Sequence, residues 1–295
     1  MDMASVTRTQ AAELVPAIPE HIDELGRICY EAFKDIHDRH HFPLDFPSVP
    51  FARQIMAMLV QGESHYAVAA VRDGQMSGSN FLWLTDEVAG VGPISTEVPL
   101  QGTGIGRALM QDVVDHAGRN GFEKIRLVQD AFNMASLSLY ASVGFDVKEA
   151  LAVMQPAPAG EPDESVRQAT EGDLDSVDRL SRSLYKVSRR NEVAESLKFG
   201  FPVFVRERGG RVVGYLTPIM IGHGVAETPE DAFAIAGQAA RLIPPEELRI
   251  FCPLSEGNLY RGFLNMGCRA IKVMNLMAIG PYERPEAVWM PSVLY

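Results

Sequence analysis

The chain has 295 residues, 46% of them hydrophobic and 22% charged, which is typical of a folded globular protein and long enough for two domains. Its formal net charge of −11 disfavours nucleic acid as a partner. No apolar run approaches the ~18 residues of a membrane helix, and residues 1–10 lack the apolar segment of a signal peptide. The cysteines Cys29, Cys252 and Cys268 have no metal-ligand spacing, which fits a reduced compartment. We therefore expect a cytoplasmic protein without a membrane partner.

The negative charge is concentrated in the first half of the chain. Residues 1–157 carry 11 Lys and Arg against 20 Asp and Glu, a net charge of −9, whereas the remainder carries 16 against 18, a net charge of −2. Such a field favours a cationic amine as substrate. A generic acidic surface that keeps the protein soluble explains the same numbers.

The predicted elements begin with a short strand at residues 15–17 and a helix opened by Pro19 and Glu20. Residues 37–50 are expected to form a loop, and residues 51–60 a second helix. The loop contains three histidines, but no cysteine or paired carboxylate stands at ligand spacing, so we expect no metal. It is expected instead to line a substrate site, through Phe42 and Phe46.

A β-hairpin is predicted next, from strands at residues 65–71 and 76–84 around a turn in which Gly74 supplies the positive φ. A strand at residues 94–98, a helix at 106–118 and a strand at 124–130 follow. This alternation with a parallel crossover predicts an α/β (α+β) fold, in which helices cover a mixed sheet.

The predicted strand at 94–98 leads into a glycine-rich loop and directly on into a helix. Three glycines within five residues let a ligand approach the backbone, and the helix N-terminus favours an anion. The spacing is neither that of a dinucleotide fingerprint, since Leu109 replaces the third glycine, nor that of a P-loop. The loop is therefore a candidate phosphate cradle, made of Gln101, Gly102, Thr103, Gly104, Ile105, Gly106 and Arg107.

A second motif follows the predicted strand at 124–130. Asn133 is followed seven residues later by Tyr140, and four residues after that by Gly144 and Phe145. Together with Gln-x-x-Gly-x-Gly at 101–106, this pattern resembles the GNAT acetyltransferases, which bind acetyl-coenzyme A. The resemblance is specific over residues 91–148.

The resemblance implies where acetyl-CoA binds and how it reacts. The pantetheine arm would lie along the strand at 94–98, the pyrophosphate would bind backbone N–H groups of the loop, and Tyr140 would protonate the departing coenzyme A thiolate as general acid. The acceptor amine would attack the thioester carbonyl directly, and backbone N–H groups near Thr96 would polarise that carbonyl. The implied cofactor-binding residues are Thr96, Val98, Gln101 to Arg107, Asn133, Ser136 and Tyr140.

The general base is not determined by the motif. Glu97 and Asp86 rank first because they lie near the relevant strands. Glu87 is a further candidate, and His41 or His65 could act through water. The carboxylate at Tyr295 is another option, because some multi-domain relatives place a chain terminus in the site.

The pattern begins again after a Pro-, Ala- and Gly-rich linker. We expect a catalytic GNAT domain at 1–155, a linker at 156–163 and a degenerate GNAT-like domain at 164–295. In the second copy, acidic residues replace the loop glycines and Phe263 stands where the hydroxyl is expected. This copy could complete the sheet, wall the substrate cleft or dimerise, and residues 287–295 could add an edge strand to either half.

Three functions fit the sequence. The leading one is an acetyl-CoA-dependent N-acetyltransferase acting on the primary amine of a small molecule, a small amine or an amino-acid-like compound. A homodimer is one option for its assembly. A relative of mycothiol synthase is the second. The third is a coenzyme-binding sensor or interaction protein without turnover, against which the retained Tyr140 argues.

Overall fold

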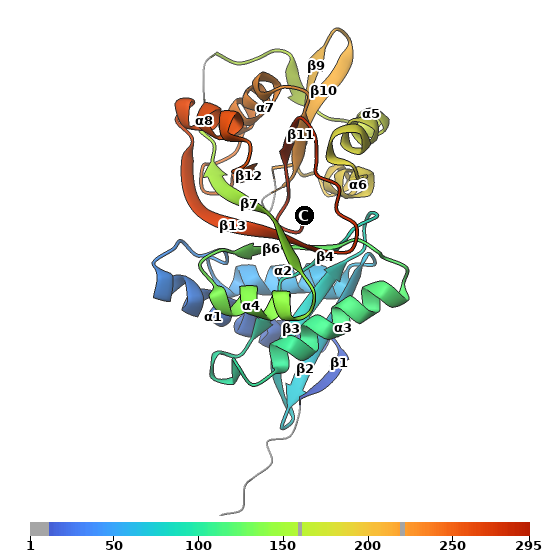
Figure 1. Ribbon diagram of the computed structural model, residues 1–295, viewed down its shortest axis with the longest axis vertical. Coiled ribbons are helices and arrows are strands. Elements are labelled where there is room, and N and C mark those ends of the chain that lie inside the picture. Colours follow the sequence, from blue (N-terminus) through green and yellow to red (C-terminus); the bar gives the residue numbers. More distant parts are fainter. Residues whose placement is uncertain (1–11, 159–160, 219–221) are drawn as a thin grey trace, which may run out of the picture. The chain divides into compact units, whose positions relative to one another are not determined.

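The computed structural model describes residues 12–158, 161–218 and 222–295. The chain divides into two compact units (Figure 1). The first unit comprises Met1–Trp83 and Val91–Arg119, and the second comprises Leu84–Gly90 and Asn120–Tyr295. Each unit is described by itself below.

The first unit is an antiparallel sheet with helices on both faces. Strand β2 (His65–Arg72) pairs with β1 (Glu13–Pro16) and with β3 (Gln75–Trp83), and β3 also pairs with the short β5 (Ser95–Thr96). Helices α1 (Ile22–His40) and α2 (Val49–Gln61) pack on each other and on this sheet. Helix α3 (Ile105–Arg119) also packs on the sheet.

Adjacent residues of β3 show that these helices cover opposite faces. Phe81 belongs to a core with Leu25 of α1 and Met56 of α2. Its neighbour Asn80 instead donates a hydrogen bond to the Leu109 carbonyl of α3 at 3.3 Å. Since successive strand residues point to opposite faces, α1 and α2 lie on one face and α3 lies on the other.

The second unit contains two sheets. In the first, β6 (Ile125–Asp130) pairs in parallel with β4 (Ala89–Val91) and antiparallel with β13 (Arg269–Ile279). Strand β7 (Asp146–Gln155) pairs with β13 and with β12 (Ile250–Pro253). The order is β4-β6-β13-β7-β12, so β13 lies between two strands that follow each other closely in the chain.

The second sheet of this unit is antiparallel throughout. Its order is β14-β11-β10-β9-β8, from strands Val288–Met290, Gly224–Ala226, Arg211–Leu216, Phe204–Arg208 and Val166–Gln168. In the described residues of the second unit, five α-helices accompany the two sheets: α4 (Met134–Ser142), α5 (Leu174–Leu180), α6 (Arg190–Lys198), α7 (Pro229–Leu242) and α8 (Gly257–Asn265).

The predicted fold class is confirmed, since both units combine helices with sheets, antiparallel in the first unit and mixed but mostly antiparallel in the second. The hairpin turn is as expected, with positive φ at Asp73 and Gly74. The buried face predicted for the helix after the glycine loop is also found, at Ile105, Leu109, Val113 and Ala117. No described helix is both long and apolar enough to cross a membrane.

Two predicted boundaries were wrong. The loop expected from residue 37 begins only after His40, because His37 is buried inside α1 and its Nδ1 lies 2.7 Å from the Phe33 carbonyl oxygen. The strand expected at 94–98 is reduced to Ser95–Thr96. A 3-10 turn at Val98–Leu100 replaces its end, since Pro99 cannot donate to a sheet ladder.

Candidate functional site

The glycine loop of the first unit has the backbone of an anion cradle. Gly102 and Gly104 have φ values of +78° and +97°, a conformation that side chains rarely adopt. A Cβ at either position would meet no atom within 4 Å, so within this unit the backbone there is open. The loop residues Gln101 to Gly104 are all exposed.

Helix α3 begins directly at the end of this loop. Its first hydrogen bond runs from the Ala108 N–H to the Gly104 carbonyl at 3.0 Å. The N–H groups of Ile105 and Gly106 therefore have no acceptor inside the helix, and they add to the positive end of its dipole. Arg107 supplies an exposed positive charge in the same turn. This set of groups suits a pyrophosphate.

The strand before the loop is held from one side by β3. Ser95 and Thr96 pair with Ser79 and Gly78, and a Cβ at Gly78 would stand 2.5 Å from the Ser95 carbonyl oxygen. Glycine is therefore required at position 78 for β5 to lie this close. Val98 follows in the 3-10 turn and is 36% exposed.

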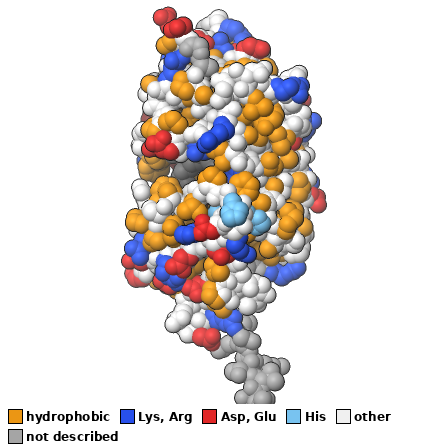
Figure 2. All heavy atoms as spheres, turned by 90° about the vertical axis from the view of Figure 1, so that its left-hand side faces the viewer, with side chains coloured by type: hydrophobic (Ala, Val, Ile, Leu, Met, Phe, Trp, Pro, Cys, Tyr) orange, Lys and Arg blue, Asp and Glu red, His pale blue; other side chains and the backbone are white. Residues whose placement is uncertain are grey.

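Glu97, one of the two preferred general bases, forms an ion pair with Arg27 of α1. Arg27 also pairs with Glu24 and Glu31. Its hydrogen bonds to Glu24 and Glu97 raise the pKa of its guanidinium. The charges on this helix are thus paired locally. Figure 2 shows acidic and basic side chains interspersed on one side of the molecule, which weakens the case for a single acidic field.

Asn133 and Ser136 form the start of α4 in the second unit. The Asn133 side-chain oxygen accepts the Ser136 N–H at 3.1 Å, so Asn133 caps this helix rather than lying within it. Gln129 of β6 donates to the Asn133 carbonyl at 2.8 Å and to the Ser136 hydroxyl at 3.0 Å. Asn275 of β13 donates to Gln129 in turn, at 3.0 Å, so a distant strand fixes this turn.

Tyr140 is buried in α4, with 8% of its surface exposed. Burial raises the pKa of its hydroxyl above the usual value of 10, and the negative charge of Asp130 raises it further. The hydroxyl is therefore protonated at neutral pH, as a proton donor must be. Its ring packs edge-on to Phe145 at 6.4 Å between centroids.

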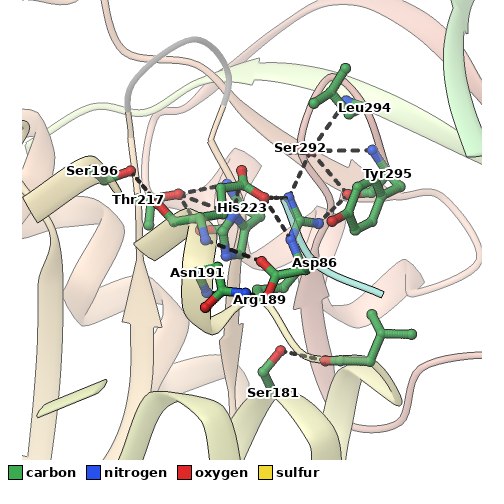
Figure 3. Close-up of polar contacts among 12 residues, drawn as sticks. Asp86, Ser181, Arg189, Asn191, Ser196, Thr217, His223, Ser292, Leu294 and Tyr295 are labelled. Atoms are coloured by element: carbon green, nitrogen blue, oxygen red, sulfur yellow. Dashed lines mark hydrogen bonds and ion pairs between the residues drawn. The ribbon is translucent and has the colours of Figure 1, made fainter. Parts of the chain in front are cut away.

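Asp86, the other preferred base, is occupied by the start of α6. Its two carboxylate oxygens accept the N–H groups of Asn191 and Glu192, each at 3.1 Å (Figure 3). Burial raises the pKa of this carboxyl, and the two backbone hydrogen bonds oppose the rise. The structure thus gives Asp86 a helix-capping contact.

The remaining base candidates have varied surroundings. Glu87 accepts the Ser188 N–H and pairs with Arg182. Burial lowers the pKa of His65 to about 4, whereas His41 is exposed at the end of α1. Tyr295 is 2% exposed and packs against Gly90, where a Cβ would stand 3.2 Å from its ring.

Sequence reasoning missed a buried polar cluster around Arg189 in the second unit. Arg189 is fully buried and donates to the Tyr295 backbone oxygen at 2.6 Å and to Ser292 Oγ at 3.0 Å (Figure 3). It also pairs with Glu192, whose other oxygen lies 3.3 Å from His223 Nδ1. No short motif marks these residues, because they come together from the start of α6, the residue before β11 and the last residues of the chain.

The predicted site residues fall in both units. The first unit holds the site residues between Thr96 and Arg107, among them Glu97. The second unit holds Asp86, Asn133, Ser136 and Tyr140. Within the second unit, the last three share one helix and its cap.

Comparison with known proteins identifies the class of protein. Residues 27–145 match the Acetyltransferase (GNAT) family. Over its full length the chain resembles the crystal structure of a Pyrococcus horikoshii protein described as an acetyltransferase, with a TM-score of 0.78 and 15% identity, covering 100% of this chain and 98% of that one. A GCN5-related N-acetyltransferase from Sphaerobacter thermophilus aligns with a TM-score of 0.60 and 16% identity over 94% of this chain and 98% of that one.

A curated relative matches part of the chain. The ribosomal protein bS18-alanine N-acetyltransferase of Escherichia coli (strain K12) is 25% identical over 112 residues, which are 38% of this chain and 75% of the relative. Residues 27–145 thus belong to the GNAT acetyltransferase family. The protein is an acetyl-CoA-dependent N-acetyltransferase.

Proposed function

We propose that the acceptor is the primary amine of a small molecule and that one acetyl-CoA binds per chain. The observation that carries the coenzyme assignment is the open, positive-φ backbone at Gly102 and Gly104 next to the N-terminus of α3. Together with Thr96, Val98 and Arg107, this loop would bind the pantetheine and the pyrophosphate. Asn133, Ser136 and Tyr140 would bind the coenzyme from α4.

In the proposed reaction the neutral amine nitrogen attacks the thioester carbonyl carbon, the C–S bond breaks and the Tyr140 hydroxyl gives its proton to the sulfur. The proton that the nitrogen loses as it becomes an amide then reprotonates the Tyr140 phenolate. Backbone N–H groups near Thr96 would stabilise the carbonyl oxygen, each by about 3 kcal/mol. The raised pKa of Tyr140 keeps the phenol protonated at neutral pH, so it holds the proton that this role requires.

The proton on the incoming ammonium needs a base, and Glu97 and Asp86 remain the two candidates. Asp86 is engaged at the start of α6, whereas Glu97 shares Arg27 with two other carboxylates. Glu97→Gln and Asp86→Asn should each be tested by a pH–rate profile. Profiles unchanged from the wild type would remove both residues from this role.

We further propose that residues 164–295 are a second GNAT-like copy without a coenzyme site, after a catalytic domain at 1–155 and a linker at 156–163. The elements of this copy follow the order of the first, from β8 through α5, α6, β9, β10, β11, α7, β12 and α8 to β13. At the start of α7, a side-chain cap stands in the place of a glycine loop. The Thr228 hydroxyl accepts the Asp231 N–H at 3.2 Å. Strand β14 pairs with β11 and contacts β12. In the proposed second copy, β14 would take the space of a second pantetheine arm.

The first experiment is acetyl-CoA calorimetry on the wild type and on the double variant Gly104→Asp with Gly106→Asp. We expect one site per chain, lost in the variant because two carboxylates would repel the pyrophosphate. Two sites would refute the degenerate second copy. Absence of binding would refute the coenzyme assignment.

A thiol-release assay on an amine panel then identifies the acceptor. Free small amines are compared with the mycothiol precursor and with a peptide that begins with alanine, since the curated relative acts on an alanine of a ribosomal protein. We expect turnover of a free small amine. Coenzyme binding without turnover of any acceptor would support a sensor instead.

A further inference from the structure

The turn between β6 and α4 is held by the side-chain amide of one β6 residue. The Gln129 Nε2 group donates to the main-chain oxygen of Asp130, to that of Asn133 at 2.8 Å and to the Ser136 hydroxyl at 3.0 Å. Gln129 is only 3% exposed, so these hydrogen bonds are shielded from water. One buried amide therefore fixes the turn from its first residue to the first turn of α4.

Strand β13 holds the other end of this amide. The Asn275 Nδ2 group donates to Gln129 Oε1 at 3.0 Å, and the two residues lie opposite each other in the register of β13 with β6. A rotation of the Gln129 amide by 180° would place its oxygen against carbonyl oxygens and its nitrogen against a donor. The network therefore permits one orientation of Gln129, and Asn275 helps to select it.

Asn133 presents an available donor at this turn. Its side-chain oxygen accepts the Ser136 N–H at 3.1 Å as the cap of α4. Since the side-chain amide is planar, its Nδ2 group is directed away from the N–H that the oxygen caps. No residue within the described ranges 12–158, 161–218 and 222–295 accepts a hydrogen bond from this nitrogen, which is not sealed from solvent. The Asn133 nitrogen can therefore donate to a ligand.

The Ser136 hydroxyl is fixed by the same network. It donates to the Asn133 carbonyl oxygen at 3.0 Å and accepts from Gln129 Nε2. The two residues that the proposed function places at the coenzyme are thus joined to each other and to Gln129. A ligand that binds side chains already held in place avoids the entropy cost of ordering them.

We propose that Gln129 and Asn275 are positioning residues for the coenzyme, because they hold the turn from Asn133 to Ser136 with the Asn133 nitrogen oriented to donate to acetyl-CoA. This inference rests on the proposed function, in which that turn binds the coenzyme. Neither Gln129 nor Asn275 contacts the coenzyme itself. Since Asn275 belongs to residues 164–295, the second half of the chain takes part in coenzyme affinity through β13.

Acetyl-CoA calorimetry and steady-state kinetics on Gln129→Met and Asn275→Leu test this inference. We expect each substitution to raise the dissociation constant and the KM for acetyl-CoA about three- to tenfold, the equivalent of one lost hydrogen bond, and to leave kcat within about twofold. The kinetics use an acceptor from the amine panel. Asn275→Leu is the milder change, so it keeps the test open if Gln129→Met does not fold.

Gln155→Met is the matched control. Gln155 lies on β7, the other neighbour of β13, where it accepts from Arg269 of β13 at 3.1 Å and donates to the Pro245 carbonyl at 2.6 Å. It thus resembles Gln129 in its contacts, but its hydrogen bonds lie outside the α4 turn. We expect the control to melt below the wild type and to retain the wild-type dissociation constant for acetyl-CoA.

A double-mutant cycle tests whether the effect of Gln129 passes through Asn133. Asn133→Ser retains a good helix cap and removes the amide donor. This substitution alone should weaken acetyl-CoA binding. Adding Gln129→Met to it should weaken binding by less than about twofold further, because the donor that Gln129 positions is already gone.

The results separate this inference from the proposed function. Weaker binding in Asn133→Ser with wild-type binding in Gln129→Met and Asn275→Leu would overturn the inference and leave the proposed function in place. An equal loss of affinity in Gln155→Met would also overturn it, since any loosening of the sheet would then weaken binding. So would additive effects in the cycle. An unchanged dissociation constant in Asn133→Ser would instead reject the proposed coenzyme role of Asn133, on which the inference rests.

Discussion

Tyr140 combines a reactive hydroxyl with a buried position. Burial and the nearby Asp130 both raise the pKa of this hydroxyl, so the phenol does not ionise near neutral pH. Asp130 in turn lies 2.7 Å from the Lys272 ammonium, a buried pair that joins β6 to β13. The hydroxyl therefore still carries its proton when a thiolate departs.

The first prediction is that Tyr140→Phe lowers kcat by about 100-fold, the lower end of what a general acid contributes, and leaves the acetyl-CoA dissociation constant within about twofold. Stopped-flow thiol release and calorimetry measure the two quantities. Because the folded-state pKa is raised, wild-type kcat should not fall on the alkaline side up to about pH 10. An unchanged kcat in the variant would remove Tyr140 from the mechanism.

Helix α6 depends on a side chain more than a hundred residues earlier in the chain. The Asn191 and Glu192 N–H groups bind Asp86, while Arg189 just before the helix binds Glu192 and the Tyr295 backbone oxygen. The element therefore ties the segment 84–90 to the last residues. We therefore expect substitutions in the segment 84–90 or in the last residues of the chain to change the stability of α6.

The second prediction is that Asp86→Ala lowers the free energy of unfolding by about 1 to 2 kcal/mol, because two N–H groups at the start of α6 lose their acceptor. Denaturant titration measures the change. Asp175→Ala is the matched control, since that carboxylate forms an exposed ion pair with Arg190 and its loss should cost less than about 0.5 kcal/mol. Equal effects would show that Asp86 is not a cap.

The third prediction concerns pH. Burial raises the pKa of Glu192, but Arg189 and His223 outweigh it and lower the net value to about 2. A depressed carboxyl pKa stabilises the fold above the unfolded value of about 4.5, and this contribution is lost as pH falls towards 2. The stability difference between wild type and Glu192→Gln should thus be largest near neutral pH and shrink between pH 4.5 and 2. A constant difference in urea titrations would contradict this assignment.

At the scale of the whole molecule, β13 decides which part of the chain can fold alone. It pairs with β6 over residues 274–279 and with β7 over residues 269–278, so it separates two strands of the first half. Strand β7 in turn pairs with β12. A fragment that ends in the linker would leave β6 and β7 with unpaired edges.

The fourth prediction is that residues 1–158 alone do not fold to a stable, monomeric form, whereas co-expression with residues 161–295 restores a complex. Size-exclusion chromatography and circular dichroism measure both. A fragment 1–158 that is monomeric and unfolds cooperatively would show that β13 is dispensable for the first half.

Local patterns located much of the candidate site but little of its surroundings. The glycine loop, helix α3 and the Asn133 cap depend on residues close in sequence, so their conformations follow from local backbone preferences. By contrast, the hydrogen bond from Asn275 to Gln129 joins residues far apart in the chain. The burial of His37 within α1 was missed because a run of polar residues there resembles a loop.

The sequence by itself determined the family, the α/β class, the candidate coenzyme loop and the candidate acid, because short motifs and hydrophobic periodicity encode them. Only the tertiary structure decided that β13 enters the sheet between β6 and β7 and that Asp86 caps α6. It alone also revealed that Arg126 is buried with its guanidinium over the Tyr282 ring. The physical reason is that burial and pairing depend on contacts between distant segments, which no local pattern records.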